Sequence, residues 1–397
     1  MMLLKYKELL LLLLSIFSVH GHAVPKANLG FSVSGTTIYD GTGAAFMMRG
    51  VSFAYTWFKN DLETSVPAIA ETGANIVRVV LSNGAQWTKD DAASVEKVIS
   101  LLSENKMITM LEVHDAIGVD DTEPLDKAVD YWIEIKSVLQ ASPTPVLLPL
   151  RPSAGQALGI KCTNMMLSVS VAQRRLCCGR VRRQWTGTGA ARCNTGATQP
   201  LAWAKCAVIT LNYLQGKEDR VIINIANEWY TKDNADAWGE AYQAAVKKLR
   251  DAGLTHLFVI DAAGWGQYPD VIPAAGPAIF EADSLKNTVF SIHMYEVAGK
   301  DMTAIKTGID NALAINIPVI VGEFATTNNG QPVDMDSILS YTEETSVGWL
   351  AWSWYGNNDP ALDMATGAAG SLTTYGEKVV NGDNGLKATS VLSKIFD

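Results

Sequence analysis

The sequence predicts an α/β fold, a (β/α)8 TIM barrel preceded by a short N-terminal β-hairpin. Eight short apolar runs alternate with amphipathic segments along the 397 residues. The runs are rich in Val and Ile and mostly lack polar alternation, as expected of parallel strands buried on both faces. Strand–helix alternation repeated eight times indicates a parallel barrel.

The expected strands follow one another at barrel-like spacing. They are Phe46–Phe53, Asn75–Leu81, Ile108–Asp115, Arg220–Glu228, Leu257–Gly264, Thr288–Glu296, Ile317–Phe324 and Gly348–Tyr355. Ahead of the first strand, the turn pairs Ser34-Gly35 and Asp40-Gly41 indicate a small hairpin within residues 28–49.

Segments with helical periodicity lie between these strands. They are Thr64–Thr72, Asp90–Asn105, Leu125–Leu139, Asp236–Ala252, Val271–Glu281, Thr303–Asn316 and Asp334–Thr345, with a last one, Thr389–Phe396, after strand eight. Asp90, Asp91 and Asp334 stand where helix N-caps are expected.

Residues 1–23 have the pattern of a signal peptide. Lys5 and Lys7 precede the apolar stretch Leu9–Val19, and small residues follow at Gly21 and Ala23. A membrane anchor is the alternative, but a bilayer span needs about 20 apolar residues. We therefore expect a secreted, extracellular protein without a membrane partner. The net charge of −9 argues against a nucleic-acid partner.

Residues 141–215 differ in composition from the rest of the chain. This block holds all five cysteines and nine basic residues, while all 41 acidic residues lie elsewhere. The cysteine spacing fits no zinc pattern, and an odd number leaves one thiol unpaired. Joining Gln140 to Gly216 would give an uninterrupted helix end, turn and strand start.

Three interpretations of this block compete: translated non-coding sequence, a genuine inserted subdomain, and a basic disordered loop. We favour the first, because a long structureless loop is uncommon inside a compact domain. Residues 24–140 and 216–397 then form a single barrel domain, for which about 250 residues suffice.

Polar residues gather at the C-terminal ends of the predicted strands, where barrels of this kind place their chemistry. The residues are Arg78 in strand two, Glu112 to Asp115 in strand three, Asn224 to Trp229 in strand four, His293 to Glu296 in strand six, Gly322 to Phe324 in strand seven, and Trp352 to Tyr355 in strand eight. A single buried charge is often a structural ion pair. Six strands converging on one rim indicate a functional site instead.

Two glutamates, Glu228 and Glu323, end strands four and seven, which face each other across the barrel. Glycosidic cleavage needs a pair of carboxyl groups: one protonates the leaving oxygen, and the other attacks or activates water. Five tryptophans lie at or beyond strand ends, namely Trp57, Trp229, Trp265, Trp352 and Trp354. Each suits stacking on a sugar ring, and each could equally pack the barrel.

Several stretches together resemble glycoside hydrolase family five in clan A, and look most like its secreted, bacterial-type endo-β-1,4-mannanases. They are Val77–Leu81, Leu111–Asp115, Arg220–Tyr230, Ala263–Pro269, Phe290–Tyr295, Val321–Phe324 and Gly348–Gly356. The resemblance covers Gly30 to Phe396 except the block. In this family the chain runs directly into the equivalent of Gly216–Arg220.

The resemblance implies that Glu228 is the general acid/base and Glu323 the nucleophile. It also implies that Arg78 keeps the nucleophile ionised and that Asn227 donates to the sugar 2-hydroxyl. An arginine partner lowers the pKa of a carboxyl, whereas an acid should lack a strong cationic partner. Retention of configuration predicts carboxyl groups about 5–5.5 Å apart.

Further substrate-binding residues follow from the same resemblance. His114, His293 and Tyr295 are implied to line the cleavage subsite, with Trp352 as its aromatic floor. Trp57, Trp265 and Trp354 are added from their strand-end positions. The sequence contains no motif for a metal ion or an organic cofactor, so neither is expected.

The expected function is retaining, endo-acting cleavage of β-1,4-mannosidic bonds in mannan, glucomannan and galactomannan by a monomer. The alternatives are an endo-β-1,4-glucanase and a non-catalytic carbohydrate-binding protein. Two stretches depart from the mannanase pattern: Ser52–Trp57 lacks a histidine, and Ala325–Thr327 replaces a glycine-rich run. Both departures affect the expected fine specificity rather than the reaction.

Overall fold

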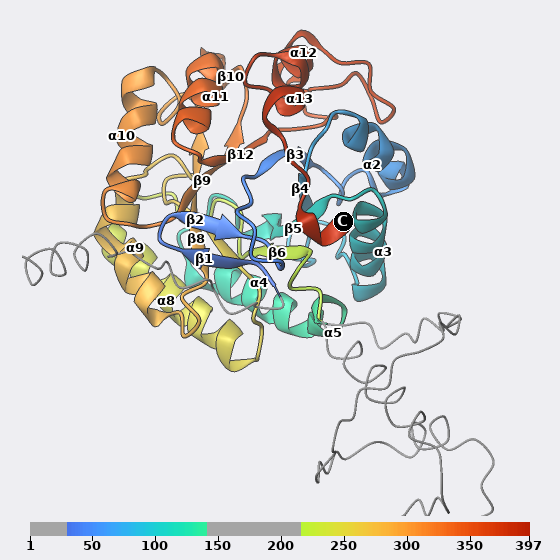
Figure 1. Ribbon diagram of the computed structural model, residues 1–397. Coiled ribbons are helices and arrows are strands. Elements are labelled where there is room, and N and C mark those ends of the chain that lie inside the picture. Colours follow the sequence, from blue (N-terminus) through green and yellow to red (C-terminus); the bar gives the residue numbers. More distant parts are fainter. Residues whose placement is uncertain (1–29, 141–215) are drawn as a thin grey trace, which may run out of the picture. The chain divides into compact units, whose positions relative to one another are not determined.

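Eight parallel strands close into a barrel in the computed structural model, which describes residues 30–140 and 216–397 (Figure 1). The barrel order is β12-β3-β4-β5-β6-β7-β8-β9. The strands are β3 (Arg49–Phe53), β4 (Ile76–Leu81), β5 (Ile108–Val113), β6 (Val221–Asn224), β7 (Phe258–Asp261), β8 (Thr288–Met294), β9 (Val319–Phe324) and β12 (Gly348–Ala351). Each lies within its predicted apolar run, so the predicted barrel is confirmed.

Helices cover the outside of the barrel (Figure 1). They are α2 (Leu62–Glu71), α3 (Ala92–Glu104), α4 (Thr122–Glu134), α5 (Lys136–Leu139), α8 (Ala235–Asp251), α9 (Val271–Ala282), α10 (Met302–Leu313), α11 (Met335–Glu344), α12 (Thr374–Asn381) and α13 (Leu386–Thr389). Asp91 and Asp334 cap α3 and α11 as predicted, since each carboxylate accepts a backbone N–H. Asp90 caps no helix and is instead buried. None of the helices in the described ranges is long and apolar enough to cross a membrane.

The predicted helix Thr389–Phe396 is wrong. The helix after the eighth strand is α12, which buries Tyr375, Val379 and Val380 and is capped by the Thr373 hydroxyl. Residues 390–393 run without helix, because Asn75 Nδ2 donates to the Val391 carbonyl and Ser393 Oγ donates to Asp40 Oδ2. Tertiary contacts thus override the local apolar pattern.

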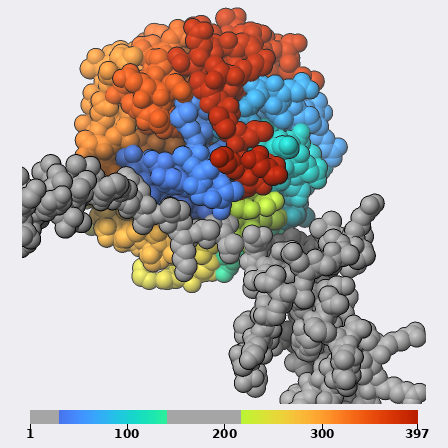
Figure 2. Space-filling view, in the orientation of Figure 1, coloured from blue at the N-terminus to red at the C-terminus, as the bar shows by residue number. Residues whose placement is uncertain are grey.

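The predicted N-terminal hairpin is confirmed and closes one end of the barrel. Strands β1 (Ser32–Ser34) and β2 (Thr37–Tyr39) pair antiparallel. In Figure 2, the blue hairpin lies beside the red C-terminal segment, over the middle of the N-terminal end of the barrel. Phe31, Ile38 and Phe46 pack with apolar residues inside the barrel. The N-terminal end of the barrel is therefore filled.

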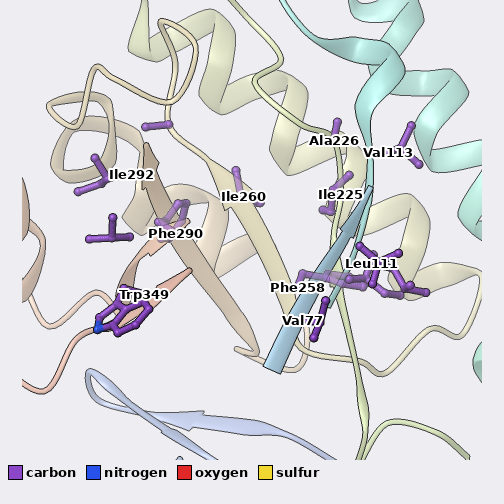
Figure 3. Packing of buried hydrophobic residues seen from close by; sticks show 14 of the residues in the cluster. Val77, Leu111, Val113, Ile225, Ala226, Phe258, Ile260, Phe290, Ile292 and Trp349 are labelled. Carbon is purple, nitrogen blue, oxygen red and sulfur yellow. The ribbon is translucent and has the colours of Figure 1, made fainter. Parts of the chain in front are cut away.

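Side-chain alternation along the strands separates two environments. Outward residues such as Val77, Leu111 and Phe290 form the core between strands and helices (Figure 3). Inward residues near the N-terminal ends, such as Ile76 and Ile108, join the hairpin cluster. One step further along the strands, the inward positions become polar, and there the candidate site begins.

The predicted signal peptide, residues 1–23, and the anomalous block, residues 141–215, lie outside the described residues. The chain on either side of the block is held together by a hydrogen bond. The Lys217 N–H donates to the Leu139 carbonyl over 3.3 Å. His256 Nε2 is 3.0 Å from the same carbonyl oxygen. The end of α5 and the approach to β6 are therefore adjacent.

Candidate active site

A fully buried arginine organises the polar layer inside the barrel. Arg78, an inward residue of β4, donates from Nε to Asn224 Oδ1 at 3.0 Å and from Nη2 to Asn227 Oδ1 at 2.6 Å. Its Nη1 is 2.7 Å from Glu323 Oε1. The guanidinium also lies within 3.8 Å of Glu112 and 3.7 Å of Asp261. A planar, forked cation satisfies this many acceptors at once, which a lysine could not do.

Glu323 is aimed into the barrel by an irregularity in β9. The register between β8 and β9 shifts after Ile292, so that His293 pairs with Glu323 and Gly322 is the extra residue. Such bulges redirect side chains. A Cβ at Gly322 would lie 2.0 Å from Ser291 Oγ, so only glycine fits. The Tyr295 hydroxyl donates to Glu323 Oε2 at 2.7 Å, which completes the carboxylate's hydrogen bonding.

Glu228 follows β6 on a strained turn. Its φ is 46°, in the left-handed region that non-glycine residues rarely adopt. The Glu228 N–H donates to Asp261 Oδ2 at 3.1 Å, and His293 Nδ1 lies 2.7 Å from Glu228 Oε1. Strain of this kind is concentrated at functional sites.

The two glutamates lie close together. One carboxylate oxygen of each, with a His293 ring nitrogen, forms a group whose atoms are within 4.8 Å of one another. Oxygens this close are compatible with the separation of about 5–5.5 Å between the two carboxyl groups of retaining glycosidases, and are closer than the 6.5 Å or more between those of inverting ones.

The same three side chains, Glu228, His293 and Glu323, have the geometry to hold a metal ion, the one such group among the residues described. However, Arg78 and Tyr295 already donate to both oxygens of Glu323. A guanidinium in contact with the carboxylate repels a second cation. The arrangement therefore suits carboxyl chemistry better than metal binding.

Burial and opposite charges compete in setting the pKa values of the site. Burial raises the pKa of Glu323, and the cations His293 and Arg78 lower it without reversing the rise. The predicted effect of Arg78 is thus present, but burial outweighs it. Burial alone would lower the pKa of His293, yet Glu323, Asp261 and Glu228 raise it well above its usual value.

An aromatic cluster stands beside Glu323. The His114 ring stacks on Trp352 at 5.7 Å between ring centroids and meets Trp57 edge-on at 5.2 Å. Trp87 packs against Trp57 and His114 as well. His114 Nδ1 is 2.9 Å from Glu112 Oε1. Trp57 is 39% exposed and presents an aromatic surface to solvent. The structure thus brings His114, Trp57 and Trp352 together.

Other predicted aromatic residues divide between surface and core. Trp265 is 44% exposed and stays a candidate for sugar stacking. Trp354 is 1% exposed and its indole donates to the Ala368 carbonyl, so it cannot stack on a sugar, and its prediction as a substrate-binding residue is wrong. Trp229 is buried in the same way. His293 lies beneath the glutamates rather than at the surface.

The first departure from the mannanase pattern also falls in the core. Phe53 and Tyr55 are 1% and 3% exposed, packed among the apolar residues between strands and helices. In the second departure, Ala325 is buried. The neighbouring Thr326 borders a cavity of about 410 Å³ with Ala361 and Tyr375.

Two contributors were missed by sequence reasoning. Asp261 ends β7 and contacts Arg78, His293 and the Glu228 backbone. It carries the signal that identified the others, a charged residue at the end of an apolar strand. Trp87 lies in a loop with no strand-end position to mark it.

A closed parallel barrel with two facing glutamates near its C-terminal end is typical of glycosyl hydrolases. The family described as Cellulase (glycosyl hydrolase family 5) matches residues 39–148 and 183–358, and the chain belongs to this family.

Within that family the chain is similar to bacterial mannan-degrading enzymes. It is 40% identical over 370 residues to a mannan endo-1,4-beta-mannosidase from Salipaludibacillus agaradhaerens, covering 92% of this chain and 96% of the relative. It is 33% identical to one from Streptomyces lividans, covering 96% and 82%. The crystal structure of a Streptomyces thermolilacinus beta-mannanase with mannohexaose has 32% identity and a TM-score of 0.70, covering 92% and 98% of the two chains.

Proposed function

We propose that this chain is a retaining endo-β-1,4-mannanase that uses Glu228 as acid/base and Glu323 as nucleophile. One observation carries the proposal: the two carboxylates lie within 4.8 Å of each other in different hydrogen-bonding environments. Glu323 contacts Arg78 and Tyr295, whereas Glu228 contacts His293. Different surroundings for two carboxyl groups assign them different roles.

The reaction proceeds by double displacement. Glu323 attacks the anomeric carbon while Glu228 protonates the departing glycosidic oxygen, which leaves a covalent glycosyl–enzyme. Glu228 then removes a proton from water, and the resulting hydroxide displaces Glu323. The Tyr295 hydroxyl and the Arg78 guanidinium stabilise the carboxylate before attack and after release.

Neighbouring residues position the sugar. Among the described residues, no acceptor lies within hydrogen-bond reach of the buried Asn227 Nδ2, although Asn227 Oδ1 accepts from Arg78. This oriented donor suits a sugar hydroxyl beside the reacting carbon. Trp352 and Trp57 supply faces on which pyranose rings can stack.

The choice of mannan rests on the relatives. Proteins named mannan endo-1,4-beta-mannosidase share 33–40% identity with this chain over most of its length. An endo-β-1,4-glucanase would use the same two glutamates. Release of reducing ends from galactomannan and from carboxymethylcellulose distinguishes the two, and we expect activity on galactomannan. Activity on carboxymethylcellulose alone would make the protein a glucanase.

Substitution of the glutamates tests the assigned roles. Glu323→Ala should abolish turnover on galactomannan while the protein still binds mannohexaose, since the stacking residues are intact. Glu228→Gln should slow the reaction by about 10²–10⁴-fold, the usual contribution of a positioned acid/base. If Glu323→Ala keeps wild-type turnover, the nucleophile has been assigned wrongly.

A secreted monomer is part of the same proposal. The apolar segment Leu9–Val19 supports export, and so does the size of a polymeric substrate. Mass determination of protein recovered from culture medium would identify the mature N-terminus, which we expect near Val24. Sedimentation of the purified protein would give its oligomeric state.

A further inference from the structure

Asp261 occupies a central and fully buried position beneath the two glutamates. It is the last residue of β7, it is 0% exposed, and its side chain faces the barrel interior. It therefore cannot touch a substrate that enters from solvent. A buried carboxylate is costly unless it is compensated by charge and hydrogen bonds, so its partners indicate what it does.

One partner is the backbone that carries the acid/base. Asp261 Oδ2 accepts the Glu228 N–H at 3.1 Å, at the residue whose φ is 46°. The opposite oxygen, Oδ1, accepts from Asn224 Nδ2 at 3.2 Å. Asp261 therefore connects the end of β6 to the strained residue that follows it.

The second partner is the imidazole that contacts Glu228. His293 Nδ1 is 2.7 Å from Glu228 Oε1, and His293 Nε2 is 3.5 Å from Asp261 Oδ1. If Nδ1 carries the proton that is donated to Glu228, Nε2 of a neutral ring has no proton. Its lone pair then points toward the Asp261 carboxylate. Because the anionic carboxylate repels this lone pair and attracts a proton, Asp261 favours an N–H at Nε2 as well. The ring is then an imidazolium between two carboxylates.

We propose that Asp261 is a positioning residue for the acid/base step, holding the Glu228 main chain in place and keeping His293 positively charged. The inference rests on the proposed function. A charged His293 donates to Glu228 Oε1 in both steps of the reaction, so the acid/base has a cationic partner, contrary to the expectation from the sequence. The transferable proton is thereby confined to Oε2, the oxygen left free to face the glycosidic bond.

The pH dependence follows from the charges around Asp261. The titratable side chains that face Asp261 or His293 are Arg78 of β4, Glu228 after β6, Tyr242 of α8 and Glu323 of β9. Burial alone would raise the pKa of Asp261, but His293 and Arg78 lower it to about 2, so it is ionised throughout the working range. The positive end of the resulting Asp261–His293 ion pair faces both glutamates.

Asp261→Asn removes this charge while keeping the shape of the side chain. The pKa of His293 should then fall, although Glu323 still raises it, and Glu323 loses part of the nearby positive charge that favours its ionised form. The acidic limb of the pH profile of kcat/KM, which Glu323 sets, should move to higher pH. We expect kcat to fall about 10-fold or more, within the contribution of a positioned acid/base, with KM little changed because Asp261 does not reach the substrate.

The matched control is Asp283→Asn. Asp283 is another fully buried aspartate, paired with Arg250 at 2.8 Å and remote from the glutamates. This variant should lose stability yet keep the wild-type pH profile and kcat. If Asp261→Asn behaves like Asp283→Asn, with a lower Tm and an unmoved profile, Asp261 is only structural and the proposal is overturned.

A second measurement does not depend on the variant folding or on the substrate. In the 15N spectrum of the wild-type protein, both ring nitrogens of His293 should stay protonated well above the usual pKa of a histidine, and a ring that loses its proton at that usual pKa would overturn the proposal. Lack of mannanase activity in the wild type would refute the proposed function alone, because this spectrum still tests the Asp261–His293 contact.

Discussion

At the residue scale, Arg78 makes the site possible. A buried cation without partners would be unstable, and so would the cluster of carboxylates around it. Together they compensate one another: Glu323, Glu112 and Asp261 all lie within 3.8 Å of the guanidinium. Removing one member of a buried charge network typically costs about 3–5 kcal/mol. Arg78, which lowers the pKa of Glu323 against the effect of burial, is thus also a structural centre.

Arg78→Lys should therefore change both stability and chemistry. A single ammonium cannot reach Asn224, Glu323 and Asn227 together, so the midpoint of urea unfolding should fall. Without the hydrogen bond from Arg78 Nη1, the pKa of Glu323 should rise, and the acidic limb of kcat/KM should move to higher pH. Denaturant titration and pH–rate measurements on galactomannan would check both effects.

Arg49→Lys provides the comparison. Arg49 is also fully buried and bonds to Glu343 and to the Val347 carbonyl, near the start of β3. It should lose a similar amount of stability and keep the wild-type pH profile. An equal shift of the acidic limb in both variants would show that the effect of Arg78 is not electrostatic.

Sequence patterns predict a site residue well where a strand fixes the position of that residue in the barrel. Glu228, Glu323 and Arg78 are all recognisable as charges in apolar strands, and the structure places them together. Trp354 has the same strand-end position, but its indole turns into the core. The direction of a side chain at a strand end depends on the following loop, which no apolar period encodes.

At the element scale, the loop after β4 is held from a neighbouring strand end. Asp115 accepts hydrogen bonds from the Gln86 N–H at 2.6 Å, the Asn83 N–H at 3.0 Å and Ser82 Oγ at 3.0 Å. This loop carries Trp87, which packs on Trp57 and His114. One carboxylate therefore fixes one side of the aromatic cluster.

Asp115→Ala should weaken substrate binding more than turnover. The loop loses three hydrogen bonds, and Trp87 no longer holds Trp57 in one orientation, so KM for mannohexaose should rise while kcat changes little. Such a pattern marks loss of binding shared by ground state and transition state. Steady-state kinetics would measure it.

Asp91→Ala is a suitable control for this loop. Asp91 caps α3 nearby by accepting from the Ser94 N–H, and losing a cap costs about 1 kcal/mol. It should lower Tm without changing KM. If both variants raise KM equally, general loosening of this region explains the effect.

The strands could all be predicted from the sequence, whereas the C-terminal helix could not. Buried parallel strands produce continuous apolar runs, which is why all eight were found. The C-terminal helix was misplaced because Val391, Leu392 and Ile395 imitate a helical face. In the structure, hydrogen bonds to Asn75 and Asp40 hold that segment across the barrel end. Contacts between distant segments are not visible in a local period.

At the scale of the whole molecule, we propose that residues 24–140 and 216–397 form one catalytic domain that does not need residues 141–215. The Lys217 N–H already donates to the Leu139 carbonyl. If Gln140 is joined to Gly216, this bond becomes the first-to-fourth hydrogen bond of a β-turn, with glycine at the third position, where several turn types favour it.

Deleting residues 141–215 should therefore leave an active barrel. The shortened protein should match the full chain in kcat and circular dichroism, and its yield should be higher because it contains no cysteine to mispair. Deleting residues 139–217 instead removes both partners of the turn bond and should lower Tm. A shortened protein that aggregates or loses activity would show that the block is required.

The bond between Leu139 and Lys217 also makes this position suitable for grafting. It lies in a connection from a helix to a strand, on the end of the barrel opposite the chemistry. Closing a longer loop costs only about 0.6 kcal/mol for each doubling of its length. A fluorescent reporter or a cellulose-adhering module could therefore be inserted there, joined to the enzyme through both of its own ends. The inserted module would lie at the end of the barrel opposite the active site. The substrate's path to the glutamates would stay open.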